Sequence, residues 1–231
     1  MLQQTQVPRV LPKYEEFLEA FPDLESLAAA PLESVLRHWQ GLGYNRRALA
    51  LKRTAELVVA EHGGRLPRDV TALRSLPGIG PATAAALTAF AFGEAHAFLE
   101  TNIRAAFLHH FFPAGDDVPD SDLLPLVEAT LDREDPRTWY YALMDYGSML
   151  KRTTVNPSRR SRHHVRQSAF EGSRRQLRAR ALRVVLDHPG THAEEVARVI
   201  AGDSAEVTTV LDELEREGFI TSRSGGYEAC R

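Results

Sequence analysis

The sequence has little cysteine and no long apolar run, and each shortage excludes a class of protein. Cys230 is the only cysteine among the 231 residues, so the chain can form no internal disulfide. An all-cysteine metal or iron–sulfur site built from this chain alone is excluded for the same reason. No run of 18 or more apolar residues occurs, so we expect no membrane span. MLQQTQVPRV lacks the pattern of a secretory signal, and the expected location is the cytoplasm.

Alternating strand-like patterns are also scarce before residue 150. Apolar residues instead recur at spacings of three and four, as at Ala48, Leu51, Ala55 and Val58, which predicts a mainly α-helical body. The expected helices cover residues 11–20, 24–29, 31–39, 46–62, 70–75, 81–92, 101–111, 121–131 and 138–151.

The end of the chain has a different pattern. We expect helices over residues 176–186, 192–201 and 204–217, followed by two short strands around a Gly-Gly turn. Thr191 is the predicted N-cap of the second helix, and Gly218 ends the third. Three helices and a hairpin are typical of a winged-helix domain. The third helix is strongly acidic, so we favour a packing or protein-contact role over DNA reading.

Basic residues outnumber acidic ones in only one segment of the chain. The net charge is −3, yet residues 151–183 hold 11 Lys/Arg and a single acid, Glu171. Such a block is a candidate phosphate-binding track, with Arg159, Arg160 and Arg162 as its predicted contacts; the alternative is a solvated linker. The predicted organisation is a domain at 1–150, a basic linker or DNA-contact segment at 151–173 and a winged-helix-like domain at 174–231.

The segment LPGIGPATAAAL predicts a helix, a glycine hairpin and a second helix. Gly78 and Gly80 permit a tight turn, and Pro81 suits the first turn of the next helix. Exposed amides at that helix start can bind an anion. The segment lacks a nucleotide P-loop pattern, so a DNA phosphate is the better ligand. The alternative is a plain turn between helices.

Four motifs together resemble one family: MLQQTQV at 1–7, WQGLGYNRRA at 39–48, LPGIGPATAAAL at 76–87 and FLETNIRAAF at 98–107. They are similar to the helix-hairpin-helix base-excision DNA glycosylases, most of all the adenine glycosylase (MutY-like) branch. The resemblance implies two mostly helical lobes with a DNA cleft and base pocket between them. It implies DNA contacts by Gln3, Gln4, Thr5 and by the hairpin residues Leu76, Gly78, Ile79 and Gly80.

The resemblance also assigns Tyr44 to the aromatic that inserts into the base stack; the alternative is a ring buried between helices. Insertion offsets part of the few kcal/mol that extruding a base costs. A monovalent cation on the backbone carbonyls of Leu76 and Ile79 would accompany the bound phosphate.

The chemistry implied by the resemblance needs two carboxylates, one to protonate the purine and one to stabilise the positively charged sugar. The family places the second, an aspartate, at the position of Glu100. The alternative role for Glu100 is a favourable charge at a helix N-terminus. The family's purine-protonating glutamate lies two residues before the methionine that is Met1 here, so we expect a start upstream of Met1; the alternative is a chain without that acid.

The lyase-lysine position and the four cysteine positions also depart from the resemblance. Ala82 stands where bifunctional relatives carry a Schiff-base lysine, so strand cleavage by that route is not expected. The four cysteines of many relatives fall here on Lys151, Ser158, Ser161 and Gln167, so no iron–sulfur cluster or other cofactor is expected. The winged-helix-like tail stands where fuller adenine glycosylases carry an 8-oxoguanine-sensing domain.

The sequence therefore predicts a monofunctional, cluster-free DNA glycosylase that excises a mispaired or damaged base, with adenine opposite guanine or 8-oxoguanine favoured. One alternative is a non-catalytic DNA-binding protein with the same fold, and another is a glycosylase for a different damaged base. The expected partner is double-stranded DNA, with no membrane contact, and the chain is expected to be a nucleoid-associated monomer. A protein partner on the C-terminal domain is also considered.

Overall fold

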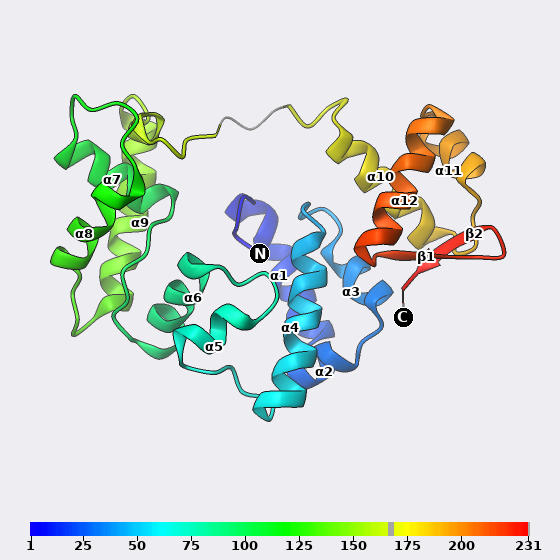
Figure 1. Ribbon diagram of the computed structural model, residues 1–231, viewed down its shortest axis with the longest axis horizontal. Helices are drawn as coiled ribbons and strands as arrows, with labels where there is room; N and C mark the ends of the chain where they lie inside the picture. The colour runs from blue at the N-terminus through cyan, green and yellow to red at the C-terminus, as the bar shows by residue number, and fades with distance from the viewer. Residues whose placement is uncertain (166–168, 231) are drawn as a thin grey trace. The chain divides into compact units, whose positions relative to one another are not determined.

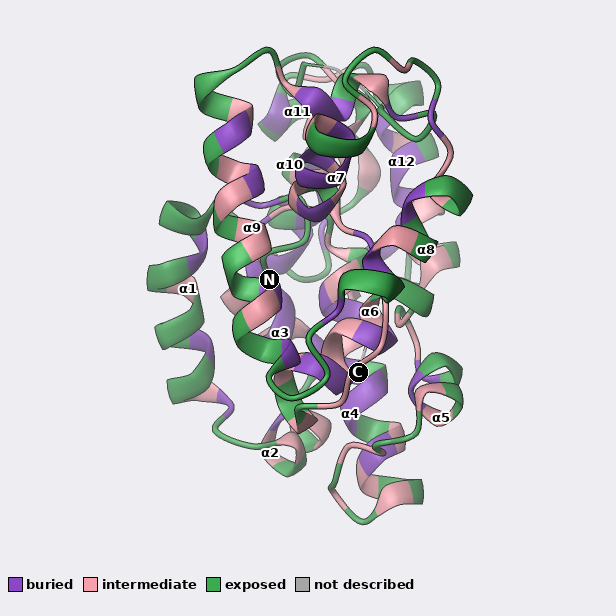
Figure 2. Ribbon diagram, turned by 90° about the vertical axis from the view of Figure 1, so that its left-hand side faces the viewer, coloured by how far each residue is buried: buried purple, intermediate pink, exposed green. Residues whose placement is uncertain are grey.

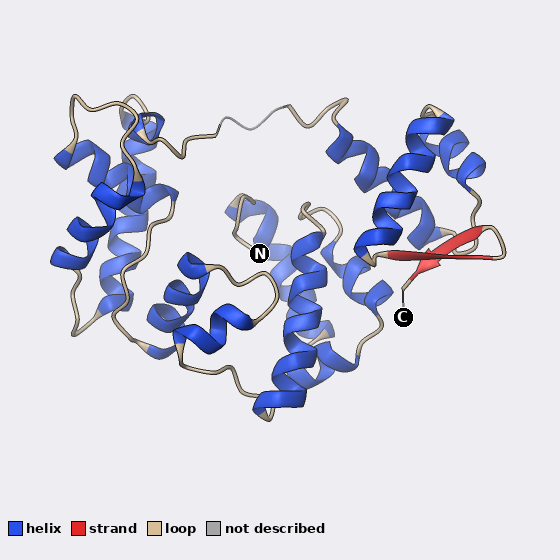
Figure 3. Cartoon of the chain, in the orientation of Figure 1, coloured by secondary structure: helices blue, strands red, loops and turns tan. Residues whose placement is uncertain are grey.

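The computed structural model describes residues 1–165 and 169–230, and within them helices dominate (Figure 3). The chain divides into two compact units. We call residues 66–166 the central unit, and residues 1–65 with 167–231 the terminal unit. This division differs from the linear one that the sequence predicts, because both ends of the chain contribute to one unit.

The terminal unit begins with four helices, marked in Figure 1: α1 (Val7–Ala20), α2 (Leu24–Ala29), α3 (Leu32–Trp39) and α4 (Arg46–His62). It ends with α10 (Arg174–Asp187), α11 (Ala193–Ile200), α12 (Ser204–Glu217) and the antiparallel strands β1 (Ile220–Arg223) and β2 (Gly226–Ala229). The three helices and the hairpin lie where the sequence predicts them, and the winged-helix description stays a prediction.

One buried apolar cluster runs through both parts of the terminal unit. It contains Trp39 and Leu36 from α3 together with Leu182, Leu211 and Phe219 from the C-terminal part. Figure 2 marks buried stretches on α3, α4 and α10, and each of these helices contributes residues to the cluster. Burial of this shared surface is the physical reason why the tail does not form a separate unit.

The central unit contains α5 (Val70–Ser75), α6 (Pro81–Leu87), the π-helical turn η1 (Thr88–Phe92), α7 (Thr101–Phe111), α8 (Asp120–Thr130), α9 (Pro136–Thr153) and the 3₁₀ turn η2 (Pro157–Arg160). Its core includes Tyr140, Phe98, Ile103, Leu108 and Leu123. No helix in the described parts of the chain is both long and apolar enough to cross a membrane.

Two local predictions are wrong. The single helix expected over 81–92 changes to a π-helical turn at Thr88, whose buried hydroxyl donates to the Ala85 carbonyl at 2.8 Å. Thr191 is not an N-cap: His192 holds that position without a side-chain bond, and Thr191 donates backward to the His188 carbonyl. Gly218 does end α12 in the left-handed conformation, as predicted.

Candidate active site and nucleic-acid interface

The glycine hairpin joins α5 to α6 in the central unit. Leu73 and Leu76 are buried, and the Ile79 amide donates to the Leu76 carbonyl at 3.2 Å. Gly78 has φ 73°, a left-handed conformation that favours glycine, and Gly80 is the N-cap of α6. Both glycines are exposed, so their backbone is accessible to a ligand. A carbonyl oxygen carries two lone pairs, so the Leu76 bond still leaves one for a cation.

Glu100 is the N-cap of α7 and is half-buried. Its Oε1 accepts hydrogen bonds from the Asn102 amide at 2.7 Å and the Ile103 amide at 2.9 Å. Both bonds use the same oxygen, and Oε2 has no hydrogen bond or ion pair within the described parts of the chain. The carboxylate is thus fixed by one oxygen while the other can face a positively charged group.

The extended segment before Glu100 is held by Tyr140 on α9. The Tyr140 hydroxyl donates to the His96 carbonyl at 2.8 Å and accepts from the Phe98 amide at 3.2 Å. The two rings of Phe98 and Tyr140 lie 4.1 Å apart between centroids. Burial raises the pKa of Tyr140 to about 12. Tyr140 therefore remains protonated and keeps its donor at neutral pH, a role that the sequence pattern does not reveal.

Backbone carbonyls in the first turn of α7 also approach α9 and η2 closely. A Cβ added at Gly147 would lie 1.9 Å from the Asn102 carbonyl oxygen, so no larger residue fits there without movement. Ser158 is buried and donates to the Thr101 carbonyl at 3.2 Å. These contacts fix the helix end that carries Glu100.

The three predicted phosphate-binding arginines have different surroundings. The Arg159 side chain is exposed and has no hydrogen bond or ion pair to any residue that the structure describes. Arg160 donates to the Leu108 carbonyl at 3.1 Å and to the Pro113 carbonyl, so it covers the C-terminal end of α7. Arg162 pairs with Asp117 at 2.9 Å. Only Arg159 therefore has the surroundings that the sequence predicts for all three.

Other residue types stand at the positions where related proteins carry their four cysteines. Ser158 and Ser161 are both buried, and Lys151 is half-buried at the end of α9. Gln167 lies outside the described residues. Within residues 1–165 and 169–230, no three His, Cys, Asp or Glu side chains come together as metal ligands would.

Arg47 joins two of the predicted DNA-contact regions in the terminal unit. Its Nη1 donates to the carbonyls of Met1 at 2.9 Å and Gln3 at 2.6 Å. Its Nη2 donates to the Thr5 hydroxyl and the Gly43 carbonyl, both at 3.0 Å. Burial lowers the pKa of Arg47. The sequence pattern does not assign a site role to Arg47, although its position beside the Gly-Tyr-Asn turn is a signal for one.

Thr5 is buried and donates to the Leu42 carbonyl at 3.1 Å, while Gln3 and Gln4 are exposed beside it. Tyr44 is 38% exposed and has φ 50°, so it is not the ring buried between helices that was the alternative. An exposed aromatic in a strained backbone conformation is frequent at functional sites.

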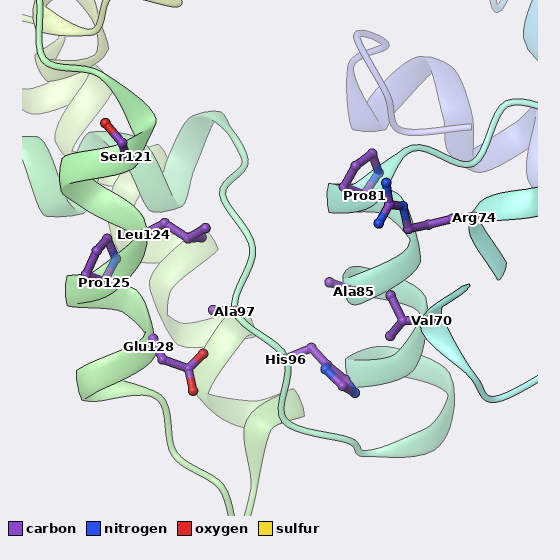
Figure 4. A pocket seen from close by; sticks show the side chains of 10 residues that line it. All are labelled: Val70, Arg74, Pro81, Ala85, His96, Ala97, Ser121, Leu124, Pro125 and Glu128. Carbon is purple, nitrogen blue, oxygen red and sulfur yellow. The ribbon is translucent and has the colours of Figure 1, made fainter. Parts of the chain in front are cut away.

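A pocket of about 500 Å³ opens in the central unit between α8 and the two hairpin helices (Figure 4). Most of its lining is apolar, with Arg74, His96, Ser121 and Glu128 as the polar exceptions. Glu100 is not among the lining residues. The pocket is therefore separate from the candidate catalytic carboxylate.

Residues 1–139 match the model of the HhH-GPD superfamily base excision DNA repair proteins. An adenine DNA glycosylase of Mycolicibacterium smegmatis is 33% identical over 245 residues, which cover 98% of this chain and 83% of that protein. The adenine DNA glycosylase of Homo sapiens is 37% identical over 165 residues, covering 69% of this chain but 29% of that protein.

Solved structures agree with the family at the level of the fold. A thermostable thymine-DNA glycosylase superposes with a TM-score of 0.56 at 26% identity, over 64% of this chain and 70% of that one. A trapped endonuclease III–DNA covalent intermediate superposes with a TM-score of 0.55 at 19% identity, over 63% and 68%. The chain belongs to the HhH-GPD superfamily of base excision DNA repair proteins, and it is a DNA-binding DNA glycosylase.

Proposed function

We propose that the protein hydrolyses the N-glycosidic bond of adenine mispaired with guanine or 8-oxoguanine in double-stranded DNA. The observation that carries this proposal is Glu100, held at the start of α7 through Oε1 with Oε2 uncommitted. Its support is the similarity to adenine DNA glycosylases over nearly the whole chain.

The reaction breaks the bond between the purine and the sugar with an oxocarbenium-like transition state. Glu100 would stabilise the positive charge that develops on the sugar, and water would then add to it. Because Oε1 is fixed by two amides, Oε2 needs little reorganisation when the charge develops. Protonation of the purine is a separate step, and we assign it to none of the described residues.

DNA contacts follow from accessibility. The hairpin backbone at Leu76, Gly78, Ile79 and Gly80 would hold a phosphate together with a monovalent cation, and Arg159 would hold another phosphate. Gln3, Gln4 and Tyr44 would meet the bases, and the buried Thr5 would support them through its bonds to Leu42 and Arg47. Arg160 and Arg162 would act through the fold, since their guanidinium groups are already bonded within the chain.

The enzyme would be monofunctional and independent of a cluster. Ala82 has no amine to form a Schiff base, so strand breaks would appear only after alkali. Ser158, which donates to the Thr101 carbonyl of α7, and the buried Ser161 would take the place of cluster ligands. We also propose that the protein acts as a cytoplasmic, nucleoid-associated monomer, and that the tail serves mainly to pack against the first helices, with a protein partner as its second role.

A substrate panel tests the proposal. The chain, and a form begun at any in-frame upstream start, would be incubated with duplexes carrying adenine opposite 8-oxoguanine, guanine or thymine, and thymine opposite guanine. We expect alkali-labile sites only at adenine opposite 8-oxoguanine or guanine. Excision of thymine instead would favour the alternative of a glycosylase for another base. Tight binding without any excision would favour the non-catalytic DNA-binding alternative.

A further inference from the structure

Tyr44 is in contact with the C-terminal part of the chain. Its hydroxyl oxygen accepts a hydrogen bond from Nη1 of Arg175 at 3.0 Å, and Arg175 lies in the first turn of α10. The residues are 131 positions apart in the sequence. Tyr44 is therefore positioned by an element that the family's shared motifs do not include.

The Tyr44 ring has a second cationic neighbour. The Arg47 guanidinium carbon lies 5.5 Å from the ring centroid, and that of Arg175 lies 5.9 Å from it. Both distances are within the range of a cation–π interaction. Since Arg47 also bonds the backbone of Gln3, Tyr44 is linked both to the N-terminal motif and to the tail.

Acidic residues of α12 hold α10 against the start of α4. Glu217 accepts from Arg178 of α10 at 2.9 Å and from Arg46, two residues after Tyr44, at 2.7 Å. The hydrogen bond from Arg46 is the largest cause of the lowered pKa of Glu217. Glu213 accepts from Arg174 at 2.6 Å and Arg178 at 2.8 Å. The acidic helix thus serves to anchor the helix that presents Arg175.

We propose that Arg175 is a positioning residue for Tyr44, so that the C-terminal part of the chain orders the side chain that enters the base stack. This inference rests on the proposed function. An exposed tyrosine on a loop loses side-chain freedom when it inserts, and a ring ordered beforehand loses less. Arg175 supplies that order through its hydrogen bond to the hydroxyl and its contact with the ring.

The test measures insertion separately from excision. Duplexes would carry 2-aminopurine beside the target adenine, because its fluorescence rises when the stack opens. The full chain would be compared with Arg175→Ala, Tyr44→Phe and the double variant. Arg183→Ala is the matched control, since Arg183 is exposed on the same helix and its side chain has no hydrogen bond or ion pair within the described parts of the chain.

We expect Arg175→Ala to slow the fluorescence rise about five- to tenfold at saturating protein, with an unchanged midpoint of thermal unfolding and an unchanged Arg183→Ala control. Tyr44→Phe removes the acceptor, so it should slow the rise by a similar factor, and the double variant should be no slower than either single one. Arg175→Lys should recover part of the rate because it keeps a donor.

Several results would overturn the proposal. Independent, multiplying effects of Arg175→Ala and Tyr44→Phe would show that Arg175 does not act through Tyr44. If Arg175→Ala weakens the salt dependence of DNA binding by the equivalent of about one phosphate contact while the fluorescence rises at the normal rate, Arg175 is a phosphate ligand only. No fluorescence rise in the bound wild-type chain would remove the role of Tyr44 itself.

A normal fluorescence rise without excision would contradict the proposed function and leave the Arg175 comparison valid. If Arg175→Ala does not fold, a wild-type rate for Tyr44→Phe would overturn the inference.

Discussion

Single arginines of one basic segment have different roles in the structure. Arg159 points its charge to solvent, whereas Arg160 donates to carbonyls at the end of α7, where four such groups lack helical partners. A count of positive charges cannot separate the two, because the difference depends on Leu108 and Pro113, about fifty positions earlier.

Replacing each arginine by alanine should separate phosphate binding from stability. Arg159→Ala should reduce the slope of log K against log salt by about 0.9 and leave the free energy of unfolding nearly unchanged. Arg160→Ala should lower that free energy by about 1–3 kcal/mol, because it leaves carbonyls without a donor, and leave the slope unchanged. Titrations of DNA binding at several salt concentrations, with urea unfolding, measure both. Equal slope changes for the two variants would contradict the assignment.

Tyr140 provides a second prediction for a single residue. Its pKa is raised by burial from the ordinary 10 to about 12, so the folded state favours the protonated phenol. Its stabilising contribution is complete below pH 10 and is lost as the pH rises from 10 to about 12, because the unfolded chain ionises first. The free energy of unfolding should fall by about 2–3 kcal/mol over that range.

Tyr140→Phe should remove this alkaline loss. It should also lower the free energy of unfolding at pH 7 by about 1–3 kcal/mol, since the His96 carbonyl and Phe98 amide lose their partner. Denaturant unfolding at pH 7, 10 and 12 checks both effects. An alkaline loss of the same size in Tyr140→Phe would show that another group causes it.

Among the elements, α7 and α9 determine where Glu100 lies. Their backbones approach closely because residue 147 is glycine, and η2 adds a bond from Ser158 to the same turn. The bounds of α4, α5, α7 and α12 could be predicted, because capping residues and apolar spacing are local signals. The π-helical turn after Leu87 could not, because no local pattern in the sequence marks where a helix changes its hydrogen-bond spacing.

Gly147→Ala tests the contact between these helices. The added methyl must displace the first turn of α7, which should cost about 1–3 kcal/mol of stability. Displacement of Glu100 by about 1 Å should slow excision about a hundredfold. Ser148→Ala, one residue along α9, is the control and should change neither quantity appreciably. Single-turnover excision and thermal unfolding provide the measurements, and a fully active Gly147→Ala would show that this approach does not position Glu100.

At the scale of the whole molecule, the two ends of the chain form one unit and the middle forms the other. The sequence indicates the helical class and the family motifs, since these are contained in short segments. It does not indicate that α10 and α12 pack with α3 and α4, because that depends on apolar faces and on pairs such as Arg46–Glu217, 171 positions apart. The same limit applies to the site, where Glu100 is found from its motif but Tyr140, Gly147 and Arg47 are found from long-range contacts.

The proposed reaction depends on the Glu100 carboxylate, whose role can be measured with a single substitution. Single-turnover excision of adenine opposite 8-oxoguanine would be measured for the unchanged chain and for Glu100→Gln. Each would also be prepared in the form that begins at an in-frame upstream start. Glu61→Gln, at an exposed position, is the control. We expect unchanged DNA affinity for Glu100→Gln and excision slower by at least about a hundredfold, because the charge opposite the developing cation is lost. Excision by Glu100→Gln at the rate of the unchanged chain would show that Glu100 does not stabilise that cation.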